Sequence, residues 1–237
     1  MRTDKRIKSI ADATGKIIDL FESNVIVADI ATDHGYIAEK VAEHPKVCEV
    51  IATDISEKCL DKTKKLVSFR KLQKITTMLG DGLKPIIRVD VAVISGIGGY
   101  EIINMLSTQN VANDGSMKCR YFVLQPAQNE YELRKWIFDN KIYMFADYVI
   151  EDAERFYPII TIDMKKRQRN KKNIFNLRLG RDNDINNQEF KNYLLMLKEN
   201  LAFIDKLDKR RIKKDKVVFE KFKLNLLIEK LLNKWYI

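Results

Sequence analysis

Residues 25–35 read VIVADIATDHG, residues 49–54 read EVIATD, and these two stretches decide the fold. Each is an apolar run that leads to an acidic residue, Asp29 in the first and Asp54 in the second. Small and polar residues follow the first run up to Gly35, and Asp54 lies 19 residues beyond that glycine. This spacing is typical of a nucleoside site, because the loop can approach the ligand closely while the second acid accepts the ribose hydroxyls.

The loop differs from the dinucleotide fingerprint G-x-G-x-x-G, since Ala31 and Asp33 stand where that pattern needs glycine. An acid at Asp33 would repel a pyrophosphate at a helix N-terminus. The D-x-A-x-D-x-G pattern is closer to the acidic loop of class I S-adenosylmethionine (SAM) methyltransferases. The sulfonium and ammonium groups of SAM suit carboxylates at Asp29 and Asp33. At this point an ordinary strand–loop–helix turn remains the alternative.

Apolar runs alternate with helical periodicity along the chain. We expect strands at 25–30, 49–54, 75–79, 89–95, 121–125, 142–150 and 156–164, and helices at 4–22, 34–43, 56–72, 99–107 and 129–139. Five β–α repeats and a final hairpin predict an α/β fold with a mostly parallel sheet that is covered on both faces. A seventh strand inserted antiparallel would make it a Rossmann-like class I methyltransferase sheet, by analogy.

Polar or glycine-rich sets follow four of these strands, where ligands of parallel sheets bind. Each set alone has the reading of an ordinary turn, but four on one rim predict a nucleoside-cofactor site. An acid and backbone amides after the third strand can read the adenine edge, and methyl transfer would occur at the glycine loop after the fourth. The expected cofactor residues are Asp29, Ala31, Asp33, His34, Gly35, Asp54, Ile55, Asp81, Gly82, Ser95 and Gly96.

Five motifs carry a family resemblance: DIATDHGYIAEKVAE, ATDIS, GDGL, ISGIGGYEII and LQPAQNEYELRKWI, in that order. Over nearly its whole length the chain resembles the bacterial tRNA (adenine-22) N1-methyltransferases. Ala31 and Thr32 replace the Gly-Ser of that pattern, and Ser95 and Ile97 replace Ala and Met. A methyl group at Ala31 would crowd the cofactor if the backbone there needs positive φ.

The resemblance implies SAM-dependent methylation of N1 of adenine 22 in tRNA, without a metal. The loop after the fourth predicted strand lacks the Asn/Asp-Pro-Pro-aromatic motif of many exocyclic-amine methyltransferases. Adenine N1 has an in-plane lone pair, so positioning and water exclusion can supply most of the catalysis. Asp33 and Gly98 are the candidates for positioning the target base, although Asp33 has an alternative role in orienting the methionine amine.

Charge divides the 237 residues into two expected domains, a SAM-binding domain at 1–163 and a basic helical tRNA-binding domain at 164–237. The first part holds 22 Lys+Arg and 24 Asp+Glu, a net of −2, and the second holds 21 and 9, a net of +12. This asymmetry favours a polyanionic partner, with a solvated lysine-rich face as the alternative. The candidate RNA-binding residues are Lys165, Lys166, Arg167, Arg169, Lys209, Arg210, Arg211, Lys213 and Lys214.

The basic segment also has helical periodicity, with apolar residues at Phe190, Leu194, Leu197, Leu201 and Ile204, and again at Phe219, Phe222, Leu226 and Leu227. This coiled-coil-like spacing covers only about two heptads in each arm. It therefore predicts an antiparallel hairpin within one chain, closed near residues 208–216, and a monomer.

Cys48, Cys59 and Cys119 form no C-x-x-C pair, which disfavours a zinc site or a disulfide framework. The sequence has neither a signal peptide nor an apolar stretch of membrane-spanning length, so we expect a cytoplasmic protein. Two alternatives stay open. One is a methyltransferase for another RNA site, a small molecule or a protein, and the other is a non-catalytic RNA-binding protein on this scaffold.

Overall fold

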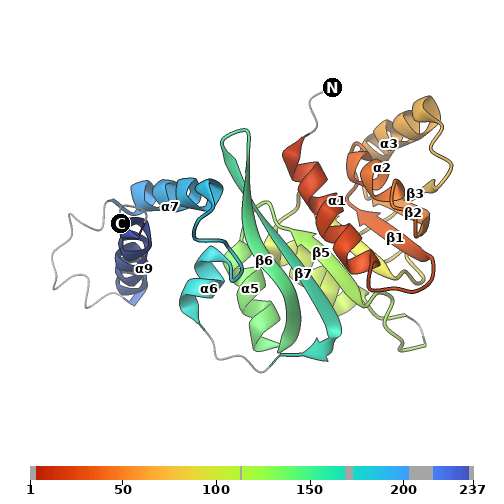
Figure 1. Ribbon diagram of the computed structural model, residues 1–237. Coiled ribbons are helices and arrows are strands. Elements are labelled where there is room, and N and C mark those ends of the chain that lie inside the picture. The colour runs from red at the N-terminus through yellow and green to blue at the C-terminus, as the bar shows by residue number, and fades with distance from the viewer. Residues whose placement is uncertain (1–3, 113, 169–172, 203–215, 235–237) are drawn as a thin grey trace.

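The computed structural model describes residues 4–112, 114–168, 173–202 and 216–234, and its centre is a seven-stranded sheet (Figure 1). The strands are β1 Val25–Ile30, β2 Val47–Asp54, β3 Ile75–Leu79, β4 Val91–Ser95, β5 Tyr121–Gln125, β6 Ile142–Asp152 and β7 Arg155–Arg167. Their order is β3-β2-β1-β4-β5-β7-β6, and only β7 runs antiparallel to both of its neighbours within this sheet. The predicted Rossmann-like sheet, with its antiparallel seventh strand, is confirmed.

The central strands are apolar because helices cover both faces of the sheet. All five residues of β4 are buried, as expected for a parallel strand that lies between two helical layers. The pairing register brings the carboxyl ends of neighbouring strands to one edge: Asp29 lies opposite Val93, and Ser95 opposite Gln125. The polar residues that follow these strands therefore share one rim.

Two helical layers bury separate cores. The helices α1 Lys5–Ile18, α2 Tyr36–Ala42 and α3 Glu57–Arg70 cover one face, where α1 lies across the sheet (Figure 1). The helices α4 Gly99–Asn104 and α5 Glu130–Asp139, with the π-helix η1 Met105–Gln109, cover the other. Ser56 caps the start of α3, where its hydroxyl accepts a hydrogen bond from the Cys59 backbone N–H at 3.3 Å.

Several boundaries differ from the expectation. As expected from the predicted elements, no helix lies between β3 and β4, so the first five strands give four β–α repeats rather than five within the described chain. The connecting residues 80–90 contain Pro85 and the positive-φ residue Gly82, and both disfavour helix. The predicted helix at 99–107 changes to π geometry at Met105, α1 ends at Ile18, and β7 continues to Arg167.

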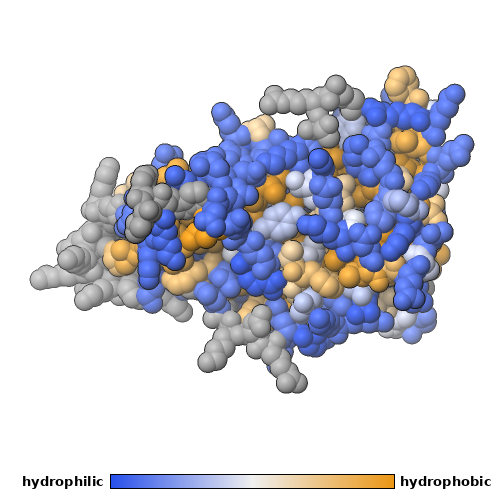
Figure 2. All heavy atoms as spheres, viewed as in Figure 1, coloured by the Kyte–Doolittle hydropathy of each residue, from blue (hydrophilic) through white to orange (hydrophobic). Residues whose placement is uncertain are grey.

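The C-terminal helices pack on the end of the β6–β7 hairpin. They are α6 Ile174–Leu179, α7 Gln188–Leu201 and α9 Lys216–Asn233. Leu194 of α7 and Ile228 of α9 are fully buried in a third apolar core that also includes Val149 of β6. Figure 2 shows hydrophilic side chains around the apolar ones that lie between these helices and the sheet.

The apolar stripe of α9 differs from the predicted one. Its buried apolar residues are Leu224, Ile228 and Leu232; the predicted Phe222 and Leu227 pack against the same core, whereas the predicted Leu226 is 48% exposed. Spacing alone thus included one exposed leucine and left out the most buried residues, because leucine stands on more than one side of this helix. The predicted hairpin closure at 208–216 and Ile204 lie outside the described residues, except for the start of α9. The hairpin itself therefore stays a prediction, although α7 and α9 contact each other.

Candidate cofactor cleft and substrate pocket

The loop after β1 has a left-handed backbone at three positions, Ala31 (φ 59°), Asp33 (φ 47°) and Gly35 (φ 75°). At Gly35 a Cβ atom would lie 2.8 Å from Cγ2 of Thr63, so glycine is required there. Ala31 adopts the conformation for which glycine is suited, at a cost of about 1–2 kcal/mol. Strain of this kind concentrates at functional sites, which agrees with the candidate role of this loop.

Asp29 is a buried carboxylate with one oxygen that lacks a hydrogen-bond donor. Its Oδ2 accepts hydrogen bonds from the Thr32 hydroxyl at 2.6 Å and from the Ala38 backbone N–H at 3.2 Å, whereas Oδ1 has no partner. Burial raises the pKa of Asp29 to about 6, against the lowering effect of these two hydrogen bonds. An unsatisfied buried acceptor of this kind fits a cationic donor such as an ammonium group.

Asp54 connects the loops that follow β1 and β2. Its Oδ2 accepts a hydrogen bond from the Asp33 backbone N–H at 3.1 Å, and its Oδ1 accepts one from the Ser56 backbone N–H at 2.9 Å. A carboxylate oxygen can accept more than one hydrogen bond, so Asp54 retains acceptor capacity for hydroxyl groups. The neighbouring Ile55 is 71% exposed and offers an apolar surface at the same rim.

The Asp33 side chain is directed to α3. Its Oδ1 lies 2.7 Å from Nζ of Lys62, and its backbone carbonyl accepts a hydrogen bond from the Thr63 hydroxyl. Partial burial raises the pKa of Asp33, but hydrogen bonds from Lys62 and Cys59 outweigh it and hold this pKa below its usual value. The neighbouring His34 ring stacks on Tyr36, with ring centroids 5.5 Å apart. Asp33 thus already has a cationic partner, and its role toward ligands stays a prediction.

The loop after β3 is held by a residue that the sequence analysis did not select. The buried Gln109 accepts a hydrogen bond from the Leu83 backbone N–H through its Oε1 at 2.8 Å. Gly82 has φ 59°, and a Cβ there would lie 2.4 Å from that same oxygen. Asp81 forms a salt bridge with Lys84, whose hydrogen bond lowers the pKa of Asp81. Gln109 belongs to the π-helix, which has no marker in the sequence.

The loop after β4 combines a fixed backbone with open space. Ser95 is buried, Gly96 has φ 76°, and no atom lies within 4 Å of the position that a Gly96 Cβ would occupy. At Gly99 a Cβ would lie 2.3 Å from the carbonyl oxygen of Asn129, so this segment packs directly on the loop after β5. Gly98 forms a parallel bridge with Gln128. The glycines thus hold the rim close to β5 and leave space above Gly96.

A cavity of about 810 Å³ opens beside Gly96, between the carboxyl ends of β4 and β5, the β6–β7 hairpin and α7. Its wall includes Gln125, whose Oε1 accepts a hydrogen bond from Nη1 of Arg6 at 3.3 Å. The Arg6 guanidinium lies 5.4 Å from the centroid of the Tyr157 ring. Volume and mixed lining both fit a small-molecule or nucleobase pocket.

The sequence analysis missed Arg6, Gln125 and Tyr157 as site residues. The position of Gln125 at the end of the fifth predicted strand, within the LQP motif, was a usable signal. No comparable signal marks Arg6 or Tyr157, because only the tertiary structure brings α1 and the hairpin to this rim.

The basic residues fall into two groups. Lys165, Lys166 and Arg167 are exposed on β7 rather than in a helix, and Nζ of Lys166 lies 3.8 Å from the Tyr143 ring centroid. The domain boundary expected at 163/164 would therefore cut through this strand. The other candidates lie outside the described residues, namely Arg169, Lys209, Arg210, Arg211, Lys213 and Lys214.

Within the described ranges, no cluster of His, Cys, Asp or Glu has the arrangement of a metal site. None of the helices that the structure describes has the length and apolarity to cross a bilayer.

The chain is similar in sequence to a family of methyltransferase domains and to named relatives. A family model described as a methyltransferase domain matches residues 5–160. A Bacillus subtilis tRNA (adenine(22)-N(1))-methyltransferase is 22% identical over 170 residues, which is 70% of this chain and 67% of that protein. A Mycoplasma pneumoniae protein, provisionally named a tRNA methyltransferase, is 30% identical over 142 residues, or 59% of this chain. That match spans 64% of the Mycoplasma pneumoniae protein, which is less than two thirds of its length.

Solved structures share the fold over almost the whole chain. The structure of M. capricolum TrmK with S-adenosyl-homocysteine has a TM-score of 0.72 at 22% identity, and the match covers 93% of this chain and 96% of that one. Streptococcus pneumoniae Sp1610 in complex with SAM has a TM-score of 0.74 at 22% identity, with 96% and 98% covered. At this level of identity the likeness concerns the fold alone.

Proposed function

Because this chain belongs to the methyltransferase domain family, we propose that it transfers a methyl group from SAM to N1 of adenine 22 in tRNA. The observation that carries the proposal is the open space at Gly96, which lies on the cofactor rim and also borders the cavity formed with Gln125. Gly96 thus adjoins both the rim expected to hold the methyl donor and the cavity that can hold the methyl acceptor. The names of the Bacillus subtilis relative and of the Streptococcus pneumoniae complex support the same reaction.

The acidic rim suits the cofactor. The free Oδ1 of Asp29 is an acceptor for an ammonium group, and Asp54 is an acceptor for ribose hydroxyls. Ile55 and the loop at Asp81 and Gly82 are positioned at the ends of β2 and β3, where they can cover and read the adenine ring. SAM supplies an electrophilic methyl carbon on its sulfonium sulfur.

The substrate pocket needs to position a base rather than to deprotonate it. The N1 lone pair of adenine attacks the methyl carbon in line while the carbon–sulfur bond breaks, so no base is required at the moment of transfer. Gln125 and the backbone at 126–127 can bind the edge of the purine, and Tyr157 offers a face for stacking. Holding the base at attack distance in a pocket that excludes water is the main catalytic contribution.

Basic residues hold the tRNA. Among them, Lys165, Lys166 and Arg167 are exposed on β7. Phosphate contacts of this kind give affinity without reading sequence, and they offset the cost of moving a stacked base into the pocket. Residues 164–237 carry a net of +12, which supports their role in this grip. We further propose a cytoplasmic monomer that acts without a metal.

The test is mass spectrometry of nucleosides from tRNA that has been incubated with the protein and SAM. We expect N1-methyladenosine at position 22, with equal yield after treatment with a chelator. N6-methyladenosine, a methylated guanosine or sensitivity to the chelator would contradict the proposal. A protein that binds tRNA without binding SAM would instead be a non-catalytic RNA-binding protein on this scaffold.

A further inference from the structure

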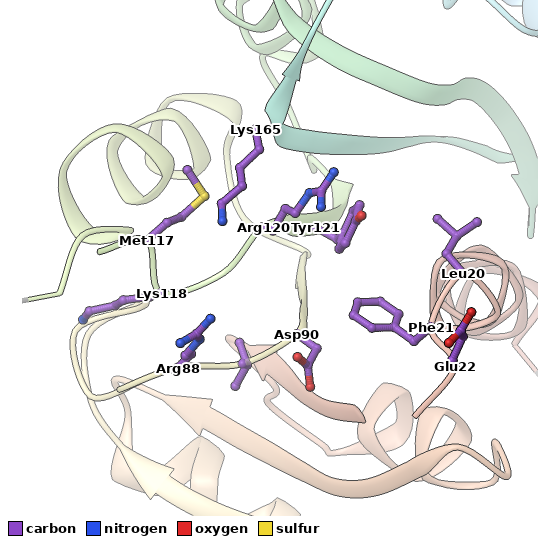
Figure 3. A pocket seen from close by; sticks show the side chains of 11 residues that line it. Leu20, Phe21, Glu22, Arg88, Asp90, Met117, Lys118, Arg120, Tyr121 and Lys165 are labelled. Atoms are coloured by element: carbon purple, nitrogen blue, oxygen red, sulfur yellow. The ribbon is translucent and has the colours of Figure 1, made fainter. Parts of the chain in front are cut away.

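A second cavity, of about 470 Å³, lies at the amino end of the sheet, opposite the cofactor rim (Figure 3). It is bounded by residues just before β4, by the first residue of β5, by the turn after α1 and by Lys165 near the end of β7. The five residues of β4 separate it from Gly96 by roughly 17 Å, at about 3.3 Å per residue. It is therefore a separate place in the fold and not part of the cofactor cleft.

The wall of this cavity is basic. Four cationic side chains, Arg88, Lys118, Arg120 and Lys165, meet there with two acidic ones, Glu22 and Asp90. The Asp90 carboxylate already accepts a hydrogen bond from the Ile26 backbone N–H at 2.8 Å through its Oδ2. The local excess of positive charge stands out because residues 1–163 as a whole carry a net charge of −2.

Two of the cations are committed to the protein and two are available. Arg120 forms a bidentate pair with Asp163, at 2.9 and 2.7 Å, and Nζ of Lys118 donates to the Leu83 carbonyl at 2.8 Å. Within the described part of the chain, the side chains of Arg88 and Lys165 make no hydrogen bond or salt bridge, although the charge of Arg88 acts on Asp114. Figure 3 shows Arg88 and Lys165 extending into the cavity from opposite sides.

Hydrogen bonds hold the backbone at or next to Arg88 and Lys165. Asp163 is 1% exposed, and its Oδ1 accepts hydrogen bonds from the backbone N–H of Lys165 at 2.9 Å and from Nε of Arg120. The Val89 backbone N–H donates to the carbonyl of Lys118 at 3.0 Å and so anchors the residue that follows Arg88. Because the backbone is held on both sides, an anion that enters needs to order only the two side chains, with which it can form charge-assisted hydrogen bonds.

Aromatic rings complete the cavity. Phe21 and Tyr121 stand edge to face, with ring centroids 5.5 Å apart, and both point toward the hollow in Figure 3. Arg120 covers the Tyr121 ring at 4.7 Å. Cations beside aromatic faces are the combination that binds the phosphate and base of single nucleotides in nucleic-acid-binding proteins.

We propose that this amino-end cavity binds a nucleotide phosphate through Arg88 and Lys165, with the attached base against Phe21. The favoured source is a backbone phosphate of the RNA substrate, because a polymer can reach both ends of the sheet at once. The choice of RNA as the source rests on the proposed function, whereas the binding of a phosphate group at Arg88 and Lys165 does not. A free nucleoside monophosphate is the other source of the same group.

The experiment uses the full chain with the substitutions Arg88→Ala and Lys165→Ala together. The matched control is Lys64→Ala with Lys166→Ala, which removes the same charge, including one exposed lysine of β7, from positions outside the cavity. We expect tRNA affinity to fall about tenfold relative to the control, and the salt dependence of binding to lose about one unit of slope, as for one lost phosphate contact. SAM affinity and melting temperature should match those of the control.

A second measurement separates the two sources. AMP is titrated into each protein, and the amide shifts around residues 20–22 and 118–121 are followed by NMR. Loss of tRNA affinity identifies an RNA phosphate. Unchanged tRNA affinity, with AMP shifts in the parent that are absent from the Arg88/Lys165 variant, identifies a free nucleotide and still supports the site. If the variant matches the control in both measurements, the proposal is overturned, whether or not the parent methylates tRNA.

Discussion

The two ends of the central strands carry opposite charge. At the carboxyl ends, Asp29 and Asp54 are among the last residues of β1 and β2, with left-handed backbone nearby, and at the amino ends Arg88 and Lys165 border the second cavity. The acidic end suits a cationic cofactor and the basic end suits an anionic polymer. One sheet can therefore separate two ligands of opposite charge by the length of its strands. Substitutions at one end of the sheet, with the other end or a matched position as the control, test this separation.

The largest expected effect is that of Asp54→Ala on SAM binding. Loss of a hydrogen bond to a charged group should weaken affinity by about 1.5–3 kcal/mol. Asp90→Ala is the control, since Asp90 also accepts a backbone hydrogen bond, but at the amino end of the sheet. Calorimetry should show weaker SAM binding for Asp54→Ala alone. Equal affinities for the two variants would remove Asp54 from the cofactor site.

A smaller effect is expected when a methyl group is added to the open space of the cleft. Gly96 and Gly115 have similar φ, 76° and 79°, and neither has an atom within 4 Å of an added Cβ. Alanine at either position should cost about 1 kcal/mol of stability. Only Gly96→Ala should also slow tRNA methylation, by about tenfold, because it displaces the reacting groups. Equal methylation rates for the two variants would show that the reaction occurs elsewhere.

The pH dependence of SAM binding tests Asp29. Since burial raises the pKa of Asp29 to about 6, this carboxyl becomes ionised between pH 5 and 7. Binding of an ammonium group needs the ionised form, so affinity should increase about fourfold from pH 5.5 to 7. In Asp29→Asn this component should vanish. If the SAM affinity of the unsubstituted protein does not change over this pH range, Asp29 does not contact the cofactor amine.

The same group gives a stability signature of defined sign. A carboxyl with a raised pKa in the folded state binds its proton more tightly there than in the unfolded chain. Its contribution is therefore complete below pH 4 and is lost as the pH rises through about 6. Relative to Asp29→Asn, the parent protein should lose thermal stability between pH 4 and 6.

The smallest expected effect concerns the backbone strain at Ala31. Glycine should relieve the left-handed conformation and add about 0.5–1 kcal/mol of stability, after the loss from a more flexible unfolded chain. Ala153→Gly is the matched control, because Ala153 has φ 47° in the turn between β6 and β7. Both variants should melt at higher temperature, but only Ala31→Gly should change SAM affinity. A lower melting temperature for Ala31→Gly would show that its strain is compensated locally.

The sequence predicted which acidic and glycine residues share the carboxyl-end rim, because these residues lie at or just after strands. Asp29 and Asp54 lie at the ends of two predicted strands, Gly82 and Gly96 lie in the loops after two others, and parallel strands bring such residues to one edge. Helical periodicity did not fully identify the buried face of α9, because apolar residues stand on more than one side of this helix. In α9 both faces carry leucine, so the buried set of Leu224, Ile228 and Leu232 could be identified only once α7 was in place.

Sequence by itself determined the α/β class, the final β-hairpin and the acidic character of the carboxyl-end rim, and analogy with class I methyltransferases supplied the antiparallel seventh strand. Tertiary structure alone decided that Arg6 lies beside Gln125, that Asp33 pairs with Lys62, and that Arg88 faces Lys165 across a cavity. These pairs are separated by 119, 29 and 77 residues. Hydrophobic periodicity reports which face of an element is buried, but long-range pairing depends on how the faces of different elements pack together.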